Sequence, residues 1–322
     1  MAAPAAARAG LDASVHALAG AVAAQISTMA LYPLDQVRFL LQVEAQPEAK
    51  AKRGGEGRRR LGETITTLLD VAGRHGLSAL YRGVGPMLLT VSLSQGMYFW
   101  AYEGASSLLL FLPFPAVLRQ LVRSLLAAVV TVAVTNPLWV ATLRLKLPPA
   151  KDKGGTVPSA DKAAARLHAE GWLSFLLVFR MMAEIQEAEG AAALWQGLGS
   201  SLWLTCVPMV QFCVYEGLRA LDLLGRETHH PSGTEAFVMG AVAKGCAVLT
   251  TYPLQVVQSN LRLSGAQRRG GTLAALARLR RERGLAGLFA GFEAKVLQTV
   301  LNGALMMLAY EKLLEGVASL RP

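Results

Sequence analysis

Leu31-Tyr-Pro-Leu-Asp-Gln-Val-Arg38 occurs three times along the chain in related form. The second version is Thr135-Asn-Pro-Leu-Trp-Val-Ala-Thr142, and the third is Thr251-Tyr-Pro-Leu-Gln-Val-Val-Gln258. Each version places a Pro-Leu pair inside a long apolar run, and the prolines recur about every hundred residues. Repetition at such a period indicates copies of one structural unit, so the sequence predicts three tandem repeats.

The composition is that of a membrane protein rather than of a soluble one. Of the 322 residues, 53% are hydrophobic and 17% are charged, against about 25% charged in a typical globular chain. Several apolar runs approach the roughly twenty residues that a helix needs to cross a bilayer. The net charge is +10, with the bases gathered in loops and no nucleic-acid-binding motif among them. An anionic substrate or anionic lipid headgroups therefore explain the charge better than DNA or RNA.

Each repeat is expected to hold two membrane-spanning helices and a short amphipathic helix between them. Proline should kink the first helix of each repeat because its ring removes a backbone donor. We predict an all-α membrane protein of six transmembrane helices with pseudo-threefold symmetry, divided into repeats at 1–112, 113–225 and 226–322. The expected spans are 15–43, 83–110, 116–147, 197–224, 234–263 and 291–318, and the expected short helices are 61–72, 172–188 and 272–283.

Residue types that carry chemistry are not arranged as in an enzyme. The five histidines lie in expected loops or at helix ends, without a nucleophile or metal-ligand spacing around them. The three cysteines, Cys206, Cys213 and Cys246, lie in apolar segments and are interpreted as small hydrophobic residues. We expect no enzyme, no cofactor and no bound metal.

A second motif leads into the even helix of each repeat and completes the pattern. It consists of a glycine, an aromatic residue and another glycine: Gly76…Tyr81-Arg82-Gly83, Gly190…Trp195-Gln196-Gly197 and Gly284…Phe289-Ala290-Gly291. The even helices also carry Tyr102-Glu103, Tyr215-Glu216 and Tyr310-Glu311. With these motifs the whole chain resembles the mitochondrial carrier family. The resemblance implies three helix pairs around a polar cavity that opens at either membrane face. The glycines would serve chain reversal alone or also expose backbone donors to a lipid phosphate.

In that family, acids and bases of neighbouring repeats close the cavity, and this chain departs from the pattern. On the side of the long loops, the gate pairs by position are Asp35 with Thr142, Trp139 with Gln258, and Gln255 with Arg38. None of these pairs joins opposite charges, so that gate is expected to rest on hydrogen bonds and packing. On the side of the termini, Glu103 should form an ion pair with Arg219 when the cavity opens toward the long loops.

These departures resemble one branch of the family, the peroxisomal carriers of CoA, FAD, NAD and adenine nucleotides. The matching stretches include Asn136-Pro-Leu-Trp-Val and Gly240-Ala-Val-Ala-Lys244. The resemblance implies a monomeric antiporter of anionic nucleotides in the peroxisomal membrane, in contact with membrane lipids. Two alternatives remain open: a mitochondrial inner-membrane carrier of another anion, and a carrier-like membrane scaffold that does not transport.

Substrate contacts in the family lie seven residues beyond the glycine that opens each even helix. These positions correspond here to Thr90, to Leu204 with its neighbour Trp203, and to Gln298. Trp203 would stack on adenine, or face lipid or core. Lys295 lies three residues before Gln298 and so shares its helix face.

Basic residues within the apolar runs are further candidates for binding an anion. A charge in mid-bilayer costs about 2.5–3.5 kcal/mol on insertion scales, which makes it a functional candidate. Lys295 would bind phosphate or form an internal ion pair, and Lys244 would bind substrate or form an interhelical hydrogen bond. Three further bases near the long-loop mouth would attract anions or extend to the membrane interface: Arg144, Lys146 and Arg262.

Overall fold

The computed structural model describes residues 19–44, 63–109, 115–147, 176–225, 233–263 and 271–319. These ranges are helical apart from short turns, and they contain no β-strand. The predicted all-α class is therefore confirmed. The chain forms two compact units, of which the first holds residues 1–39, 57–84 and 291–322 and the second holds 40–56 and 85–290.

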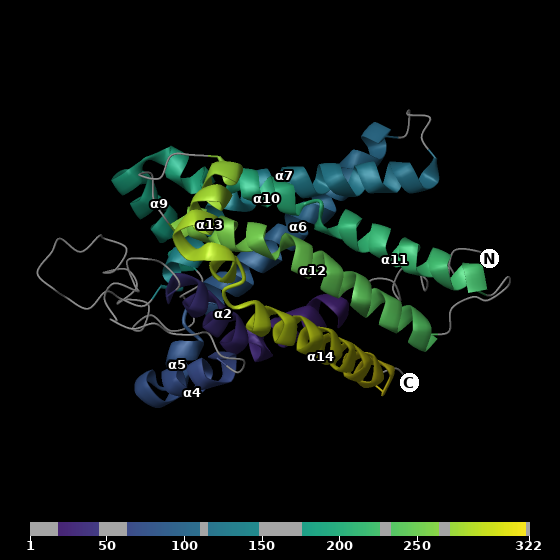
Figure 1. The fold of residues 1–322 in the computed structure, drawn as a ribbon, viewed down its shortest axis with the longest axis horizontal. Helices are drawn as coiled ribbons and strands as arrows, with labels where there is room; N and C mark the ends of the chain where they lie inside the picture. Colours follow the sequence, from purple (N-terminus) through teal and green to yellow (C-terminus); the bar gives the residue numbers. More distant parts are fainter. Residues whose placement is uncertain are drawn as a thin grey trace, which may run out of the picture. The chain divides into compact units, whose positions relative to one another are not determined.

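The helices follow the repeat order that the sequence predicts (Figure 1). In the first repeat a helix over 19–30 precedes α2 (Tyr32–Glu44), α4 (Glu63–His75), α5 (Leu77–Leu80) and α6 (Val84–Leu109). The second repeat holds α7 (Ala116–Leu145), α9 (Leu177–Glu189), the 3₁₀ segment η2 (Ala191–Trp195), α10 (Leu198–Leu204) and α11 (Val207–Gly225). The third repeat holds α12 (Gly233–Leu263), α13 (Thr272–Leu288) and α14 (Phe292–Ser319). Each predicted helix that falls within the described residues is present, with ends shifted by a few residues.

The motif prolines lie within or at the start of long helices. A turn precedes α2 just before Pro33, whereas α7 and α12 continue through Pro137 and Pro253. A proline cannot donate to the carbonyl four residues earlier, which leaves that oxygen in need of another partner. Ahead of Pro137 this carbonyl belongs to Ala133, and Nε1 of Trp195 donates to it at 3.3 Å. Trp195, the aromatic residue of the second motif, thus gives the Ala133 carbonyl the hydrogen bond that Pro137 of the first motif cannot donate.

Glycines at both ends of each linker adopt left-handed backbone angles. The φ values are 77° and 75° at Gly76 and Gly83, 85° and 75° at Gly190 and Gly197, and 65° and 74° at Gly284 and Gly291. In the described part of the chain, only glycines have positive φ. Other residues would meet a clash between Cβ and the carbonyl there, so the paired glycines are required for the reversal into each even helix.

The even helix of the second repeat is divided in two, although the sequence predicts one continuous span. Helix α10 ends at Leu204 and α11 begins at Val207. Pro208 explains the division because it offers no backbone donor to the preceding turn. There the hydroxyl of Thr205 donates to the carbonyl of Leu202 at 2.7 Å. The even helices of the other repeats, α6 and α14, are continuous over 26 and 28 residues.

The second unit has an apolar core at the end of α7. Val140, Ala141 and Leu145 of α7 are fully buried there. They pack against α9 and η2 through Leu177, Val178, Met181, Ile185, Ala193 and Leu194. The short helix of the second repeat is therefore fixed to the long helix by burial of its apolar face.

The first unit contains the corresponding junction of the first repeat. Tyr32, which precedes the motif proline, donates its hydroxyl to the carbonyl of Arg82 at 2.6 Å. Its ring stacks on Tyr81 with the centroids 6.2 Å apart. Earlier in the chain, the hydroxyl of Ser27 donates to Oδ1 of Asn302 on α14 at 2.6 Å. Polar contacts thus join helices whose remaining side chains are largely apolar.

Several long helices are suited to a membrane environment. Two helical segments, Leu118–Leu145 and Ala191–Leu221, have the length and apolar character of spans, and a third exists if Thr272–Leu288 and Phe292–Val317 form one broken span. The sequence predicts six spans, and α6 and α12 also have spanning length at 26 and 31 residues. Polar residues such as Gln95 in α6 and Lys244 in α12 reduce their apolar character.

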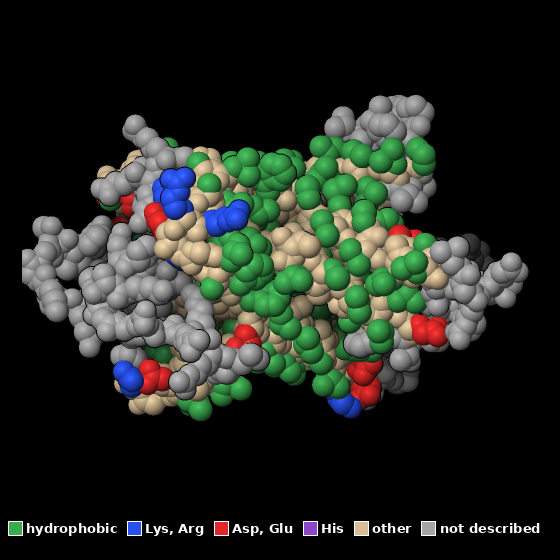
Figure 2. All heavy atoms as spheres, in the orientation of Figure 1, with side chains coloured by type: hydrophobic (Ala, Val, Ile, Leu, Met, Phe, Trp, Pro, Cys, Tyr) green, Lys and Arg blue, Asp and Glu red, His purple; other side chains and the backbone are tan. Residues whose placement is uncertain are grey.

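Exposed apolar side chains cover part of the second unit. Figure 2 shows hydrophobic side chains gathered over α11 and α12, with few charged side chains among them. The exposed residues include Met209, Phe212 and Leu221 of α11 and Val238, Val242 and Leu249 of α12. An apolar face of this kind is suited to lipid rather than to water.

Candidate functional site

The second unit has an open cavity of about 610 Å³ between α6, α7, α10, α11 and α12. This volume is within the range of small-molecule sites. Its polar and aromatic lining is Ser94, Gln95, Tyr98, Thr131, Trp139, Ser201, Thr205, Gln255, Gln258 and Arg262. A second cavity of about 740 Å³ adjoins it on the side of the termini and shares Tyr98, Ala128, Thr205 and Pro208. The two cavities therefore adjoin each other through these four residues.

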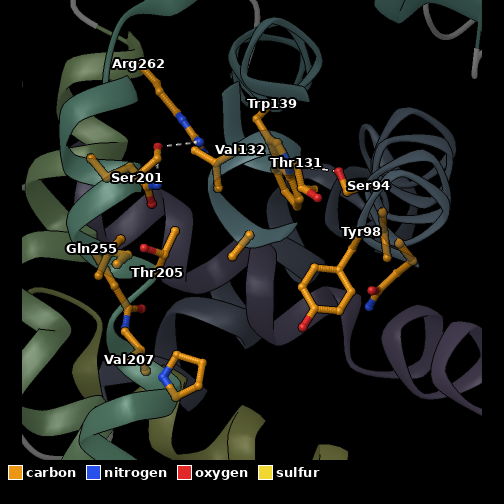
Figure 3. Close-up of a pocket in the computed structure, with 16 residues that line it drawn as sticks. Ser94, Tyr98, Thr131, Val132, Trp139, Ser201, Thr205, Val207, Gln255 and Arg262 are labelled. Carbon is orange, nitrogen blue, oxygen red and sulfur yellow. Dashed lines mark hydrogen bonds between the residues drawn. The ribbon is translucent and has the colours of Figure 1, made fainter. Parts of the chain in front are cut away.

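Arg262 occupies the long-loop end of the first cavity, in the last turn of α12. Its Nη2 donates to Oδ1 of Asn136 at 3.2 Å and to Oγ of Ser201 at 3.0 Å. Figure 3 shows the side chain directed toward Ser201. Its Cζ lies 5.8 Å from the ring centroid of Trp139. Arg262 therefore joins α12 to both α7 and α10, and it is buried with 9% exposure.

Three predicted gate residues line the cavity with Arg262: Trp139, Gln255 and Gln258. Nε1 of Trp139 donates to Oγ of Ser94 at 3.1 Å, and Nε2 of Gln258 donates to Oγ of Ser201 at 2.7 Å. The predicted pairing of Trp139 with Gln258 is thus replaced by hydrogen bonds from each of them to a serine on an even helix. The prediction that this end is held by hydrogen bonds and packing agrees with these contacts.

Thr90 does not line the cavity, although its position predicts a substrate contact. Its hydroxyl is fully buried and lies 2.7 Å from the hydroxyl of Thr142. Both threonines are therefore engaged with each other in this conformation. The predicted pairings of Asp35 with Thr142 and of Gln255 with Arg38 each join the two units and stay predictions.

The other predicted substrate residues of the second unit divide between the cavity and the surface. Leu204 lines the cavity. Trp203 is 58% exposed, and Lys244 is also exposed on α12. Neither residue belongs to the cavity lining, and their contact with substrate stays a prediction. The interpretation of Trp203 as a lipid-facing residue fits its exposure better.

The remaining predicted residues lie in the first unit. Asp35 and Arg38 form an ion pair within α2, with Nη2 and Oδ1 3.1 Å apart. Nε2 of Gln298 on α14 donates to Oδ1 of Asp35 at 3.4 Å. Lys295 is half-buried one turn earlier on the same helix. This cluster places Gln298 beside a gate residue, and its contact with substrate stays a prediction.

The predicted ion pair between Glu103 and Arg219 is not formed in this conformation. Glu103 instead accepts a hydrogen bond from Nη2 of Arg123 at 3.2 Å. The Arg123 guanidinium also lies 3.7 Å from the ring centroid of Tyr102, and its Nε donates to the Tyr102 carbonyl at 2.8 Å. Arg219 is paired with Glu216, one turn earlier on α11, at 3.8 Å. The terminus-side acid is therefore held by α7 rather than by α11.

The structure adds three functional candidates that the sequence analysis did not predict: Asn136, Ser201 and Arg123. A signal for Asn136 exists, because the other two repeats have tyrosine before the motif proline. Ser201 and Arg123 carry no such signal, since their importance depends on partners far away in the sequence. Within the described ranges, no cluster of histidine, cysteine and carboxylate residues could hold a metal ion.

Comparison with known proteins agrees with this repeat architecture. The family model described as mitochondrial carrier protein matches residues 10–112, 115–222 and 229–319. The chain belongs to the mitochondrial carrier family. Its three repeats are the three matches, and proteins of this family are membrane transporters rather than enzymes. The cavity of the second unit is therefore part of a carrier-family protein.

Relatives of this carrier include several proteins named for peroxisomes. It is 35% identical to the mouse peroxisomal membrane protein PMP34, over 93% of this chain and 92% of that protein. It is 30% identical to the Arabidopsis thaliana peroxisomal nicotinamide adenine dinucleotide carrier, over 95% and 96%. It is 26% identical to the peroxisomal adenine nucleotide carrier 1 of Glycine max, over 94% and 91%. These names agree with the branch of the family that the sequence resembles.

Proposed function

We propose that this carrier exchanges nucleotide-type cofactors, namely CoA, FAD, NAD and AMP or ADP, across the peroxisomal membrane. The observation that carries the proposal is the cavity of about 610 Å³, which has a polar and aromatic lining. Tyr98 and Trp139 offer aromatic faces for a base, and Arg262 offers a positive charge. The names of the relatives support NAD and adenine nucleotides as substrates. CoA and FAD rest on the resemblance of the sequence.

Exchange would proceed by alternating access, with a different closure at each end. Hydrogen bonds from Trp139, Gln258 and Arg262 hold the long-loop end of the second unit in this conformation. In the opposite conformation, Glu103 would leave Arg123 and pair with Arg219. A transported solute shifts this equilibrium only through different affinity for the two conformations. The three repeats, 1–112, 113–225 and 226–322, would act as one monomeric membrane domain.

Several predicted residues would complete the substrate site when the conformation changes. Thr90 would become available once its hydroxyl separates from Thr142. Lys295 and Gln298 would contribute a phosphate contact from α14, and Lys244 would approach substrate only in a conformation that turns it from the surface. The glycines that open the even helices, Gly83, Gly197 and Gly291, would bind lipid phosphates through backbone donors.

Uptake by the purified carrier in liposomes tests the proposed function. Liposomes loaded with AMP, CoA or NAD should take up labelled nucleotide faster than empty liposomes, because exchange requires a substrate on both sides. Equal rates in loaded and empty liposomes would count against exchange. Failure of every nucleotide in the panel would favour a scaffold or a carrier of another anion. Imaging of the tagged protein would separate peroxisomes from mitochondria.

The contribution of Lys295 is tested in the same assay. A charge-assisted hydrogen bond contributes about 1.5–3 kcal/mol, so Lys295→Ala should weaken apparent affinity about ten- to a hundredfold for every phosphate-bearing substrate. Lys295→Arg should retain part of the activity. Normal uptake by Lys295→Ala would exclude the assignment, and lost uptake with a lowered melting temperature would favour a structural ion pair.

A further inference from the structure

Arg262 is a buried cation whose hydrogen-bond partners are all neutral. The guanidinium has five N–H donors, and its partners are the amide oxygen of Asn136 and the hydroxyl of Ser201. Its Nε is buried without any hydrogen-bond partner. Among the described residues, no carboxylate lies within ion-pair distance of Arg262. The positive charge is therefore held at the cavity by neutral groups, namely Asn136, Ser201 and the Trp139 ring.

Arg144, a second arginine in this region, has the contacts expected of a structural residue. Arg144, near the end of α7, is paired with Glu189 through both carboxylate oxygens, with Nη2 and Oε2 3.0 Å apart. Arg144 does not line the cavity, whereas Arg262 does. Burying a charge without a counter-ion is costly. The arginine that faces the cavity is the one that lacks a carboxylate, which points to a counter-charge supplied by a solute.

The surroundings of Arg262 favour a phosphate attached to an aromatic base. A planar guanidinium fork matches two phosphate oxygens. The Trp139 ring, 5.8 Å from the guanidinium carbon, offers an adjacent face on which a base could stack. A nucleoside monophosphate unit carries both groups at a short separation, and the cavity of about 610 Å³ has room for it.

We propose that Arg262 binds the phosphate of the nucleotide substrate, and that this phosphate displaces Asn136 and Ser201 from the guanidinium. The inference rests on the proposed function and adds a subsite to it. The contacts of Arg262 connect α12 with α7 and α10. Their replacement by the substrate releases this connection at the long-loop end. Substrate binding and opening of that end thus use the same guanidinium.

The test compares AMP with adenosine, which lacks only the phosphate. Binding is measured for purified protein in detergent, from the ligand-induced rise in melting temperature over a concentration series. The wild-type protein should bind AMP more tightly than adenosine, and Arg262→Gln should lose about ten- to a hundredfold in AMP affinity while adenosine binding changes little. Arg262→Lys should lose less, because it keeps the charge but not the fork. Arg180→Gln, which removes a 46% exposed arginine of α9, should match the wild type.

Ser201→Ala separates a phosphate subsite from a purely structural connection. This variant removes an acceptor that Arg262 shares with Gln258 and keeps the charge, so AMP affinity should stay unchanged or rise. A purely structural Arg262 would make Ser201→Ala and Arg262→Lys change AMP binding in the same direction. That result would overturn the proposal even if Arg262→Gln failed to fold.

Inorganic phosphate distinguishes failure of this proposal from failure of the proposed function. If phosphate stabilises the wild type most, Arg262→Lys less and Arg262→Gln not at all, and no nucleotide is transported, the subsite stands and the nucleotide function fails. If nucleotides are transported and Arg262→Gln retains the wild-type preference for AMP over adenosine, the subsite fails and the function stands.

Discussion

The second and third repeats build the same junction with different side chains. In the third repeat, Tyr252 donates its hydroxyl to the Ala290 carbonyl at 2.6 Å and stacks on Phe289 at 6.1 Å. In the second repeat, Nδ2 of Asn136 donates to the carbonyls of Leu194 and Gln196 at 3.0 and 3.2 Å. Both side chains therefore bind backbone just before the glycine that opens the even helix.

The difference lies in what remains after that bond is made. The tyrosine fills its site with a ring, whereas the smaller asparagine leaves an amide oxygen that accepts from Arg262. A neighbouring contact changes as well: Arg144 meets Glu189 in the second repeat, whereas Arg283 donates to Asn260 in the third. The second repeat therefore keeps the backbone geometry of the third, while its asparagine provides a polar group that binds Arg262.

Among the variants that test this difference between the repeats, Asn136→Leu should have the largest effect on stability. It removes the donor to two buried carbonyls and an acceptor of a buried arginine, which should lower the free energy of unfolding by about 3–5 kcal/mol. Thermal and denaturant unfolding in detergent measure the loss. A loss no greater than that of Tyr252→Phe would show that the two junctions are equivalent in energy.

Substitution of the motif glycines of the second repeat should have a smaller effect. Gly197 is in the left-handed region, with φ 75° and ψ 2°, so alanine there should cost about 1–2 kcal/mol in backbone strain. Gly190, with φ 85° and ψ 162°, is in a region essentially confined to glycine, where strain costs about 1–3 kcal/mol. A Cβ at Gly197 would also lie 3.0 Å from Cγ of Arg262. Thermal unfolding should show a lowered melting temperature for both Gly190→Ala and Gly197→Ala, and a wild-type melting temperature for either would contradict the strain.

Tyr252→Phe should weaken the third repeat by less than Asn136→Leu weakens the second. The substitution keeps the ring stacked on Phe289 and removes the hydroxyl, which donates to the Ala290 carbonyl and accepts from Nε2 of Gln42 at 3.4 Å. A buried acceptor left without its donor costs about 1–2 kcal/mol. Tyr32→Phe in the first repeat is the matched variant, since Tyr32 makes the corresponding bond to Arg82. Similar losses from both would confirm that these two repeats share one junction.

Glu103→Gln should have the smallest effect on stability. The Glu103 side chain is 76% exposed, and exposed ion pairs contribute less than about 1 kcal/mol. Transport should nevertheless slow, because the predicted pair with Arg219 closes the opposite conformation. Reversing both charges, with Glu103→Arg and Arg219→Glu, should restore part of the rate. If the double variant transports no better than either single variant, Arg219 is not the partner.

Prolines and glycines made the architecture predictable from sequence. Their effect on the backbone is local, so the Pro-Leu and Gly motifs placed the helices and the reversals without knowledge of packing. Pro208 carries the same kind of signal for the division of α10 from α11, and the six-span prediction did not use it. The helix ends differ because capping depends on contacts as well as on sequence.

The candidate site was less predictable because its residues meet across repeats. Arg262 and Asn136 are 126 positions apart, and Gln258 and Ser201 are 57 apart. Counting from motif glycines identified Leu204 as a lining residue but also selected Thr90, whose hydroxyl is used by Thr142. Counting from motif acids likewise could not reveal Arg123 as the partner of Glu103. Position within a repeat fixes a helix face, whereas the partner on that face depends on the tilt of the neighbouring helix.

The division between α10 and α11 has a mechanical consequence for the second repeat. A continuous helix must bend or break backbone hydrogen bonds before its two halves can tilt separately. Here Pro208 has already removed that constraint, and Ser201 lies on the short piece while Arg219 lies on the long one. Ser201, which accepts from Gln258 and Arg262 at one end, can therefore change its angle without turning Arg219 at the other end. The two pieces of this even helix, α10 and α11, can tilt separately, whereas α6 and α14 are continuous and each tilt as a whole.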